Sequence, residues 1–204
     1  MAEGYLRQHA LAHRALEARA AAAAGRDGGV RLWLEPAGTQ LCLRGDAHGA
    51  LGAAVRSVFE LSLPAAGSVS AVATRRILWL GPDEWLAVCA GADAGVLVSA
   101  LERALAGAHA LVSDVSHSRC IFGLSGPDAR HVLMKGCGLD LDPVAFAAGQ
   151  CAQSALARAH MLLHQISDAP CYHVYVHRSF ADYMFAWLED AAAEYALVPG
   201  AGQA

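Results

Sequence analysis

The sequence predicts an α+β fold made of two ββα-type lobes with antiparallel sheets. A strand, a tight turn, an aromatic-rich strand and an amphipathic helix follow one another twice, over Arg76–Ala106 and again over His160–Tyr195. Hairpins interspersed with helices are typical of antiparallel sheets and not of a doubly wound parallel sheet. A chain of 204 residues also suits one domain, or two small lobes that share a core.

In the first half, short strands alternate with helices. Arg31–Glu35 and Gln40–Arg44 are predicted strands, and Pro36–Thr39 between them has a turn composition. We expect Asp46 to cap a helix that runs to about Phe59.

A hairpin is predicted next. Arg76–Leu80 and Trp85–Cys89 flank Gly81–Glu84, which places proline at the second turn position. Asp93 is then expected to cap a helix that stops at Gly107. The apolar residues of this helix share one face: Val96, Leu97, Ala100, Leu101, Ala104 and Leu105.

The second half follows two strands that flank Ser116. A helix is predicted at about Pro127–Lys135, because proline is tolerated at the first helical position and Asp128 faces the positive end of the helix dipole. Three strands follow, at Ala152–Arg158, His160–Ile166 and Cys171–His177.

The last helix is expected to open at Ser179, with Asp182 in the capping-box position three residues later. Its helical spacing predicts a buried apolar face composed of Phe180, Tyr183, Met184, Trp187, Leu188 and Ala191.

The chain is expected to divide into an N-terminal arm over residues 1–29, a folded domain over residues 30–198 and a flexible tail over residues 199–204. The arm is rich in alanine and arginine and ends in a glycine-containing break. Its apolar residues are too sparse to stabilise a helix in water, so we expect a partner surface to order it.

The charge of the chain argues against a nucleic-acid partner. The formal net charge is −4, and Arg75–Arg76 is the only adjacent basic pair, whereas nucleic-acid binding needs a basic patch. Charged residues interrupt the N-terminal segment, and no apolar run approaches the ~18 residues that would span a bilayer. We therefore expect a cytoplasmic chain without membrane contact.

The six cysteines are expected to be buried free thiols. None belongs to a CxxC motif, and each has apolar neighbours, where a thiol behaves as a small hydrophobe. They are Cys42, Cys89, Cys120, Cys137, Cys151 and Cys171.

Asp114, Ser116 and His117 have the composition of a catalytic triad but not its geometry. On a strand, Asp114 and Ser116 share one face while His117 points to the other. We expect the first two to satisfy backbone groups at a strand end. Ser125 is interpreted as part of a helix N-terminus, because Pro127 stands where a nucleophile elbow needs glycine.

The histidines do not predict a metal site. His160 and His164 have a ligand spacing only on a helix, and this segment is a predicted strand. His173 and His177 also lie on a predicted strand, where histidines are usually core or surface residues.

Other candidate groups have simpler interpretations. Asp140 and Asp142 precede Pro143 and predict a turn in preference to a carboxylate pair. Glycine-rich phosphate motifs are absent from the sequence. The tryptophans are expected to be core or interface anchors: Trp33, Trp79, Trp85 and Trp187. The residues thus predict no catalytic, cofactor-binding or metal-binding position.

A longer motif lies between Val112 and Leu141. It reads D-V-S-H, an apolar strand, S-G-P-D-A at the opening of a helix, and then D-L. This order resembles the first, folate-binding domain of the folate-dependent aminomethyltransferases of the glycine cleavage system. Three segments are similar to a closer family, the gamma subunits of heterotetrameric sarcosine oxidase: LWLGPDEWL at Leu78–Leu86, KGCGLDL at Lys135–Leu141 and RSFADY at Arg178–Tyr183.

One element of the transferases is missing. Their catalytic carboxylate lies in a hairpin one strand after this motif, which falls at Ala157–Gln165 in this chain. That segment reads ARAHMLLHQ and contains no carboxylate, and a leucine cannot act as a general base. The resemblance therefore implies a transferase fold without its catalytic group, as in the gamma subunits.

The resemblance implies a non-catalytic subunit of a complex that oxidises sarcosine to glycine and hydrogen peroxide. The one-carbon unit would leave as formaldehyde or pass to tetrahydrofolate. The implied partners are alpha, beta and delta subunits, with FAD, FMN, NAD, zinc and tetrahydrofolate held by those chains. The alternative is a free-standing folate-binding or aminomethyltransferase-like protein.

Overall fold

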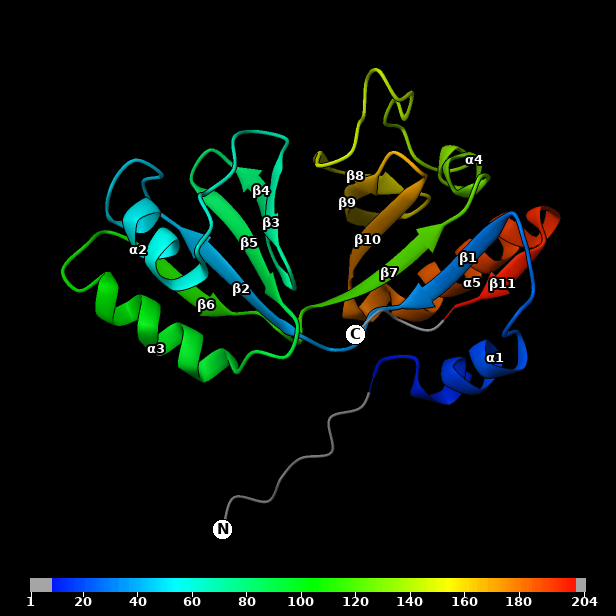
Figure 1. Ribbon diagram of the computed structural model, residues 1–204, viewed down its shortest axis with the longest axis horizontal. Coiled ribbons are helices and arrows are strands. Elements are labelled where there is room, and N and C mark those ends of the chain that lie inside the picture. Colours follow the sequence, from blue (N-terminus) through cyan, green and yellow to red (C-terminus); the bar gives the residue numbers. More distant parts are fainter. Residues whose placement is uncertain (1–8, 201–204) are drawn as a thin grey trace, which may run out of the picture.

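The computed structural model describes residues 9–200, which form two lobes (Figure 1). The terminal lobe holds residues 9–34 and 119–200, and the insert lobe holds residues 39–114. The chain therefore starts in the terminal lobe, builds the insert lobe, and then returns.

The terminal lobe contains a six-stranded sheet in the order β11-β1-β7-β10-β9-β8. Its pairs are antiparallel except for β1 with β11, which is parallel. The bounds are β1 Val30–Leu34, β7 Arg119–Ser125, β8 Cys151–Leu156, β9 Ala159–Ser167, β10 Cys171–His177 and β11 Leu197–Pro199, with helices α1 Leu16–Ala22, α4 Ala129–Met134 and α5 Ala181–Ala192.

The insert lobe contains a five-stranded antiparallel sheet in the order β3-β4-β5-β2-β6. Two helices cover its outer face, so the lobe has its own apolar core between helices and sheet. The bounds are β2 Thr39–Arg44, α2 Ala50–Phe59, β3 Val69–Val72, β4 Arg75–Gly81, β5 Glu84–Cys89, α3 Ala94–Ala104 and β6 Leu111–Asp114.

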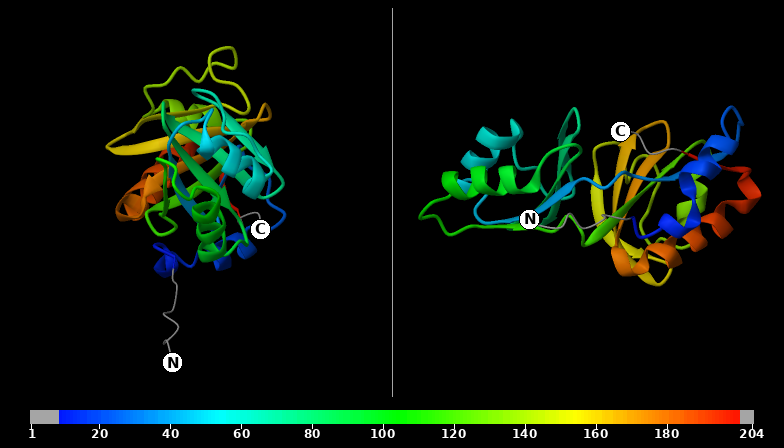
Figure 2. Two further views of the ribbon diagram at one scale, coloured as in Figure 1. Left: turned by 90° about the vertical axis from the view of Figure 1, so that its left-hand side faces the viewer. Right: turned by 90° about the horizontal axis from the view of Figure 1, so that it is seen from below.

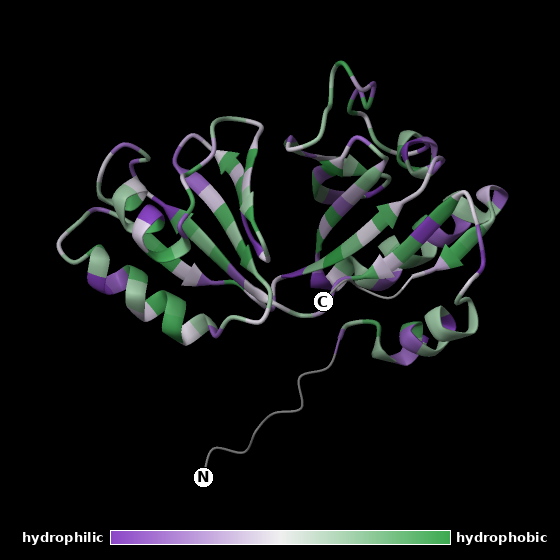
Figure 3. Ribbon diagram, viewed as in Figure 1, coloured by the Kyte–Doolittle hydropathy of each residue, from purple (hydrophilic) through white to green (hydrophobic). Residues whose placement is uncertain are grey.

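The two sheets face each other, and the helices lie on the outer sides (Figures 1 and 2). We call the interface between the sheets the seam. Hydrophobic residues are frequent along the strands of both lobes (Figure 3). A separate apolar cluster fills part of the seam: Leu78, Leu80, Leu86 and Val88 from the insert lobe, and Ile121, Cys151, Leu162 and Tyr175 from the terminal lobe.

Most predicted elements are present. The β4–β5 hairpin forms as expected, and Asp93 caps α3 by accepting a hydrogen bond from the Val96 amide at 3.1 Å. The three predicted strands of the second half are β8, β9 and β10. The predicted helix at Pro127–Lys135 is the shorter α4, and strands β3 and β11 were not predicted.

Two predicted helix caps are wrong. Asp46 does not cap α2, because Gly49 is the N-cap and the Asp46 side chain accepts from the His48 amide instead. Strands β1 and β2 form as predicted, and the turn-like segment between them crosses from one lobe to the other. Asp182 does not close a capping box, because it pairs with Arg14 at 2.9 Å.

The buried face of α5 is also different from the prediction. Phe180 and Tyr183 are 40% and 38% exposed, and Trp187 is half-buried against Gly136. The side chain of Phe185 takes the core position instead and packs against Phe122 with ring centroids 6.3 Å apart. Met184, Leu188 and Ala191 are buried as predicted, and Ala181 and Ala192 complete the core stripe.

The described part of the N-terminal arm packs on the terminal lobe. Leu11 is only 1% exposed and belongs to the core of that lobe. Arg14 and Arg19 form ion pairs with Glu189 of α5, and both guanidinium groups lie 5.5 Å from the Phe185 ring centroid. Whether a partner surface also contacts the arm stays a prediction. Residues 1–8 of the arm, and 201–204 of the expected tail, lie outside the described residues.

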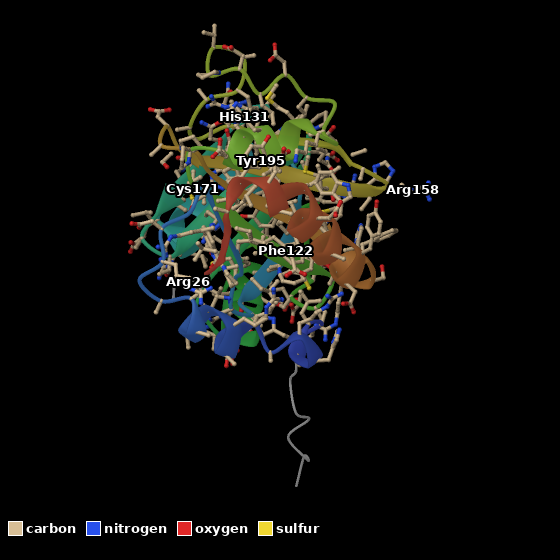
Figure 4. The ribbon with its side chains drawn as sticks, turned by 90° about the vertical axis from the view of Figure 1, so that its right-hand side faces the viewer. Arg26, Phe122, His131, Arg158, Cys171 and Tyr195 are labelled. Atoms are coloured by element: carbon tan, nitrogen blue, oxygen red, sulfur yellow. The ribbon has the colours of Figure 1, made fainter. Side chains whose placement is uncertain are left out.

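The segment that follows α5 packs against α4. The ring of Tyr195 stacks on His131 of α4 with centroids 6.2 Å apart, and both are labelled in Figure 4 together with Phe122 of the sheet. Lys135 lies 4.7 Å from the centroid of the Tyr195 ring. Over residues 9–200, no helix has both the length and the apolar character needed to cross a membrane.

Candidate functional site

A row of side chains crosses the terminal sheet on its seam face. Strand register places Trp33 opposite Gly123, Gly123 opposite His173, and His173 opposite His164. Successive residues of a strand alternate faces, so the next residues on this face are Glu35 and Tyr175. This row brings buried polar side chains into the seam.

Three of these groups form a hydrogen-bonded chain with an arginine of the other lobe. Glu35 accepts hydrogen bonds from the Nε2 of His173 at 3.0 Å and from the indole Nε1 of Trp33 at 2.6 Å. The Arg76 guanidinium of β4 donates to the Nδ1 of His173 at 2.5 Å. His173 is 4% exposed, so the chain is closed to solvent at its centre.

The hydrogen bonds fix the protonation states. Burial lowers the pKa of His173, and the Arg76 charge lowers it further, against the opposing effect of Glu35. Neutral His173 thus carries its proton on Nε2 and accepts at Nδ1. Burial would raise the pKa of the Glu35 carboxyl, but the bonds from His173 and Trp33 and the Arg76 charge hold it below its ordinary value.

Two neighbours are buried without hydrogen bonds of their own. Burial, helped by the neighbouring His173 ring and the Arg76 charge, lowers the pKa of His164 to about 3, and no described group bonds its Nδ1. Burial raises the pKa of the Tyr175 phenol to about 12. Arg76 lies near this hydroxyl and opposes that shift, but the two groups do not meet hydrogen-bond geometry.

This arrangement suits a structural role. Both ring nitrogens of His173 are occupied, so the imidazole has no free position from which to accept a proton from a substrate. Arg76 belongs to the insert lobe, His173 to the terminal lobe, and Glu35 to the segment that joins them. The chain of bonds therefore links the two lobes across the seam.

This network was not predicted from the sequence. The sequence of β4 did contain a signal for a buried charge. Arg76 precedes Leu78 and Leu80, two core residues, by two and four positions, and therefore faces the same buried side of the strand. A charge at such a position needs a partner. Nothing local, however, connects Arg76 with His173, 97 residues away.

The candidate triad is a strand-end turn, as predicted. The amide and hydroxyl of Ser116 both donate to the Asp114 carboxylate, at 2.9 and 2.5 Å. Ser116 also accepts from the Gln40 amide at 3.0 Å, while His117 is exposed. Ser125 ends β7, immediately before the turn that leads into α4.

The other candidates also have structural roles. Asp140 accepts from the Asp142 amide at 3.0 Å, and Asp142 accepts from the Val144 amide at 2.9 Å, which confirms the predicted turn. The six thiols are all free, although Cys42, Cys137 and Cys171 are only half-buried. Across the described chain, no three His, Cys, Asp or Glu side chains are grouped as metal ligands.

The segment expected to lack a carboxylate is the β8–β9 turn and strand β9. Its seam-facing side chains are His160, Leu162 and His164, since Leu162 belongs to the seam cluster and the others are two residues away. The position from which a transferase carboxylate would act therefore presents apolar and imidazole groups.

Comparison with known proteins identifies the family. Residues 44–194 match the model of the sarcosine oxidase gamma subunit family. The sarcosine oxidase subunit gamma of Corynebacterium sp. (strain U-96) is 34% identical over 195 residues, which cover 93% of this chain and 92% of that one. The subunit from Corynebacterium sp. (strain P-1) is 37% identical over 66% of this chain, and the match spans 63% of the relative's own length.

Solved structures agree with the sequence comparison. A chain of the heterotetrameric sarcosine oxidase from Corynebacterium sp. U-96 superposes with a TM-score of 0.83 and 32% identity, over 93% of this chain and 96% of that chain. The glycine cleavage aminomethyltransferase T of Bartonella henselae shares the fold, with a TM-score of 0.58 and 14% identity over 79% of this chain and 45% of its own. The chain belongs to the sarcosine oxidase gamma subunit family.

Proposed function

We propose that this chain is a non-catalytic gamma subunit of a heterotetrameric sarcosine oxidase. The complex would convert sarcosine to glycine with formation of hydrogen peroxide, and would release the one-carbon unit as formaldehyde or pass it to tetrahydrofolate. The partners would be alpha, beta and delta subunits in the cytoplasm.

The side chains that fill the seam support this proposal. In this fold, two lobes could enclose a substrate between their sheets, but here the chain's own side chains occupy that space. The only acidic group of the polar network, Glu35, already accepts two hydrogen bonds. A group held in this way supports a fold and is poorly placed for proton transfer. We therefore assign FAD, FMN, NAD, zinc and tetrahydrofolate to the other subunits.

Co-expression with the candidate partner subunits tests the proposal. A tag on this chain should recover a yellow complex that produces hydrogen peroxide when sarcosine is added. The chain purified alone should be colourless and inactive with sarcosine. Peroxide formation by the isolated chain above a flavin-free control would overturn the non-catalytic assignment, and failure to recover any flavoprotein would overturn the subunit assignment.

The alternative function is a free-standing folate-binding or aminomethyltransferase-like protein. The fold shared with aminomethyltransferase T favours it, whereas the side chains of β9 disfavour the transferase chemistry. Titration of the isolated chain with tetrahydrofolate, followed by its intrinsic tryptophan fluorescence, separates the two functions. Saturable binding would support the alternative.

A further inference from the structure

A second polar group lies in the seam, four residues along β10 from His173. Strand register pairs His177 of β10 with Arg119 of β7. The same register pairs Val176 with Met161, which brings His160 of β9 beside His177. Three basic side chains from three neighbouring strands therefore form one row on the seam face.

These three residues line a cavity. It has a volume of about 40 Å³ and is also lined by Leu80, Gln153, Met161, Leu162 and Tyr175. We call it the Arg119 cavity. A space of this size holds more than one water molecule, since one water needs ~10–15 Å³. It is far below the ~300–1,000 Å³ of sites that enclose a whole cofactor, so it fits one small polar group.

Arg119 forms no direct ion pair within the described chain. No carboxylate of residues 9–200 approaches its guanidinium within 4.0 Å. Glu84 is near enough to raise the pKa of Arg119, but its carboxylate accepts the Cys42 thiol at 3.4 Å. Burial has the larger effect and lowers that pKa, and an arginine still remains charged. A half-buried cation without a direct ion pair is costly, and an anion at the cavity would offset the cost.

We propose that the Arg119 cavity binds a carboxylate group. The planar guanidinium of Arg119 would donate to both carboxylate oxygens, which is the geometry that arginine provides best. His160 and His177 would supply further donors when protonated. The carboxylate can come from a small molecule or from an aspartate or glutamate of a neighbouring subunit, and the two sources are separated below.

Acetate is the probe for the isolated full-length chain. Histidine ring signals are followed by NMR while chloride is replaced by acetate at constant ionic strength. We expect a saturable shift of the His160 and His177 signals, because both rings line the cavity. Arg119→Gln should weaken acetate binding by about tenfold or more, the effect of losing a charged hydrogen-bond partner.

Two controls keep the test decisive. Arg103→Gln removes an equal charge from exposed α3 and should leave the acetate response unchanged. If circular dichroism shows that Arg119→Gln unfolds the chain, Arg119→Lys is used in its place. Lysine keeps the positive charge but cannot donate to both carboxylate oxygens as the planar guanidinium does. Shifts that do not saturate, or that are equal in the wild type and the folded Arg119 variant, would overturn the proposal.

Co-expression with the partner subunits identifies the source of the carboxylate. If a partner side chain fills the cavity, Arg119→Gln also lowers the recovery of the complex relative to Arg103→Gln. If the ligand is a small molecule, recovery is the same for both variants. Because the acetate titration uses the isolated chain, its failure is distinct from failure of the proposed subunit function.

Discussion

The indole ring of Trp33 lies directly over Gly123, its partner on the adjacent strand. A Cβ at Gly123 would be 1.9 Å from the Cε2 of Trp33 and 2.4 Å from its Nε1. The absence of a side chain at this position lets the indole lie across β7, where its Nε1 donates to Glu35. Gly123 is therefore needed for the network that links the lobes.

Gly123→Ala is expected to destabilise the protein. The new methyl group would displace Trp33, and overpacking of this kind costs ~1–3 kcal/mol. The free energy of unfolding is measured by urea denaturation. Gly138→Ala is the matched control, because a Cβ at Gly138 meets nothing within 4 Å. Equal stability of the two variants would mean that Trp33 can move at no cost.

Stability is expected to fall in mild acid because of the seam histidines. The pKa of His164 is lowered to about 3, and that of His173 is also lowered, from an ordinary value of 6.5. Between these values the unfolded chain binds more protons than the folded one. The free energy of unfolding therefore decreases as pH falls below about 6.5, by up to ~1.4 kcal/mol per pH unit for each histidine.

Protonation of Glu35 also lowers the free energy of unfolding, but at lower pH than the histidines. Its folded pKa lies below the ordinary 4.5, so its contribution is present above that value and is lost as pH falls through the folded pKa. Urea unfolding measured from pH 7 to about pH 3 should show the decline. His164→Gln should make it shallower, and an unchanged slope would show that His164 is not neutral in the folded state.

Two phenylalanines near the start of α5 should differ sharply in their effect on stability. Phe185 is 4% exposed and packs against Phe122, whereas Phe180 is 40% exposed. Phe185→Ala is expected to cost ~3–5 kcal/mol, as large core truncations do. Phe180→Ala should cost less than ~1 kcal/mol, the size of an ordinary surface substitution. The reverse order in thermal or urea unfolding would place the wrong face of α5 in the core.

The arm should contribute to the stability of the terminal lobe. Leu11 is 1% exposed in the core, so Leu11→Ala is expected to cost ~2–5 kcal/mol. Leu111→Ala provides the comparison, since Leu111 is 52% exposed. Deletion of residues 1–24 should lower the melting temperature by circular dichroism. A deletion without effect on melting would mean that the arm contributes to assembly alone.

Local sequence signals predicted the elements but not the contacts between them. The hairpin turn at Gly81–Glu84 and the Asp93 cap depend on a few adjacent residues, and both form as predicted. The cap at Asp182 failed because Arg14, 168 residues away, competes for the same carboxylate. The buried face of α5 was predicted only in part: Met184, Leu188 and Ala191 are buried, but Phe185 takes the core position expected for Phe180 and Tyr183. Helical spacing alone could not show that Phe122 of β7 packs against Phe185.

The polar network of the seam could not be predicted for the same reason. Alternation along β4 places Arg76 on a buried face, but only the packing of the two sheets across the seam shows that His173 meets it there. The neutral tautomer of His173 depends on two partners from two other segments. The family motifs indicated the fold, and these contacts are what the three-dimensional structure adds.

The parallel pair of β1 and β11 constrains how the protein is made. Val30 on β1 lies opposite Leu197 on β11, so almost the whole chain is synthesised between the two partners. Until β11 emerges from the ribosome, the outer edge of β1 keeps its backbone groups unpaired, and an open edge can recruit other chains. The insert lobe, which is continuous in sequence, can close first. A chain that is truncated before β11 would therefore have a folded insert lobe and an unpaired edge on β1 that can pair with other chains.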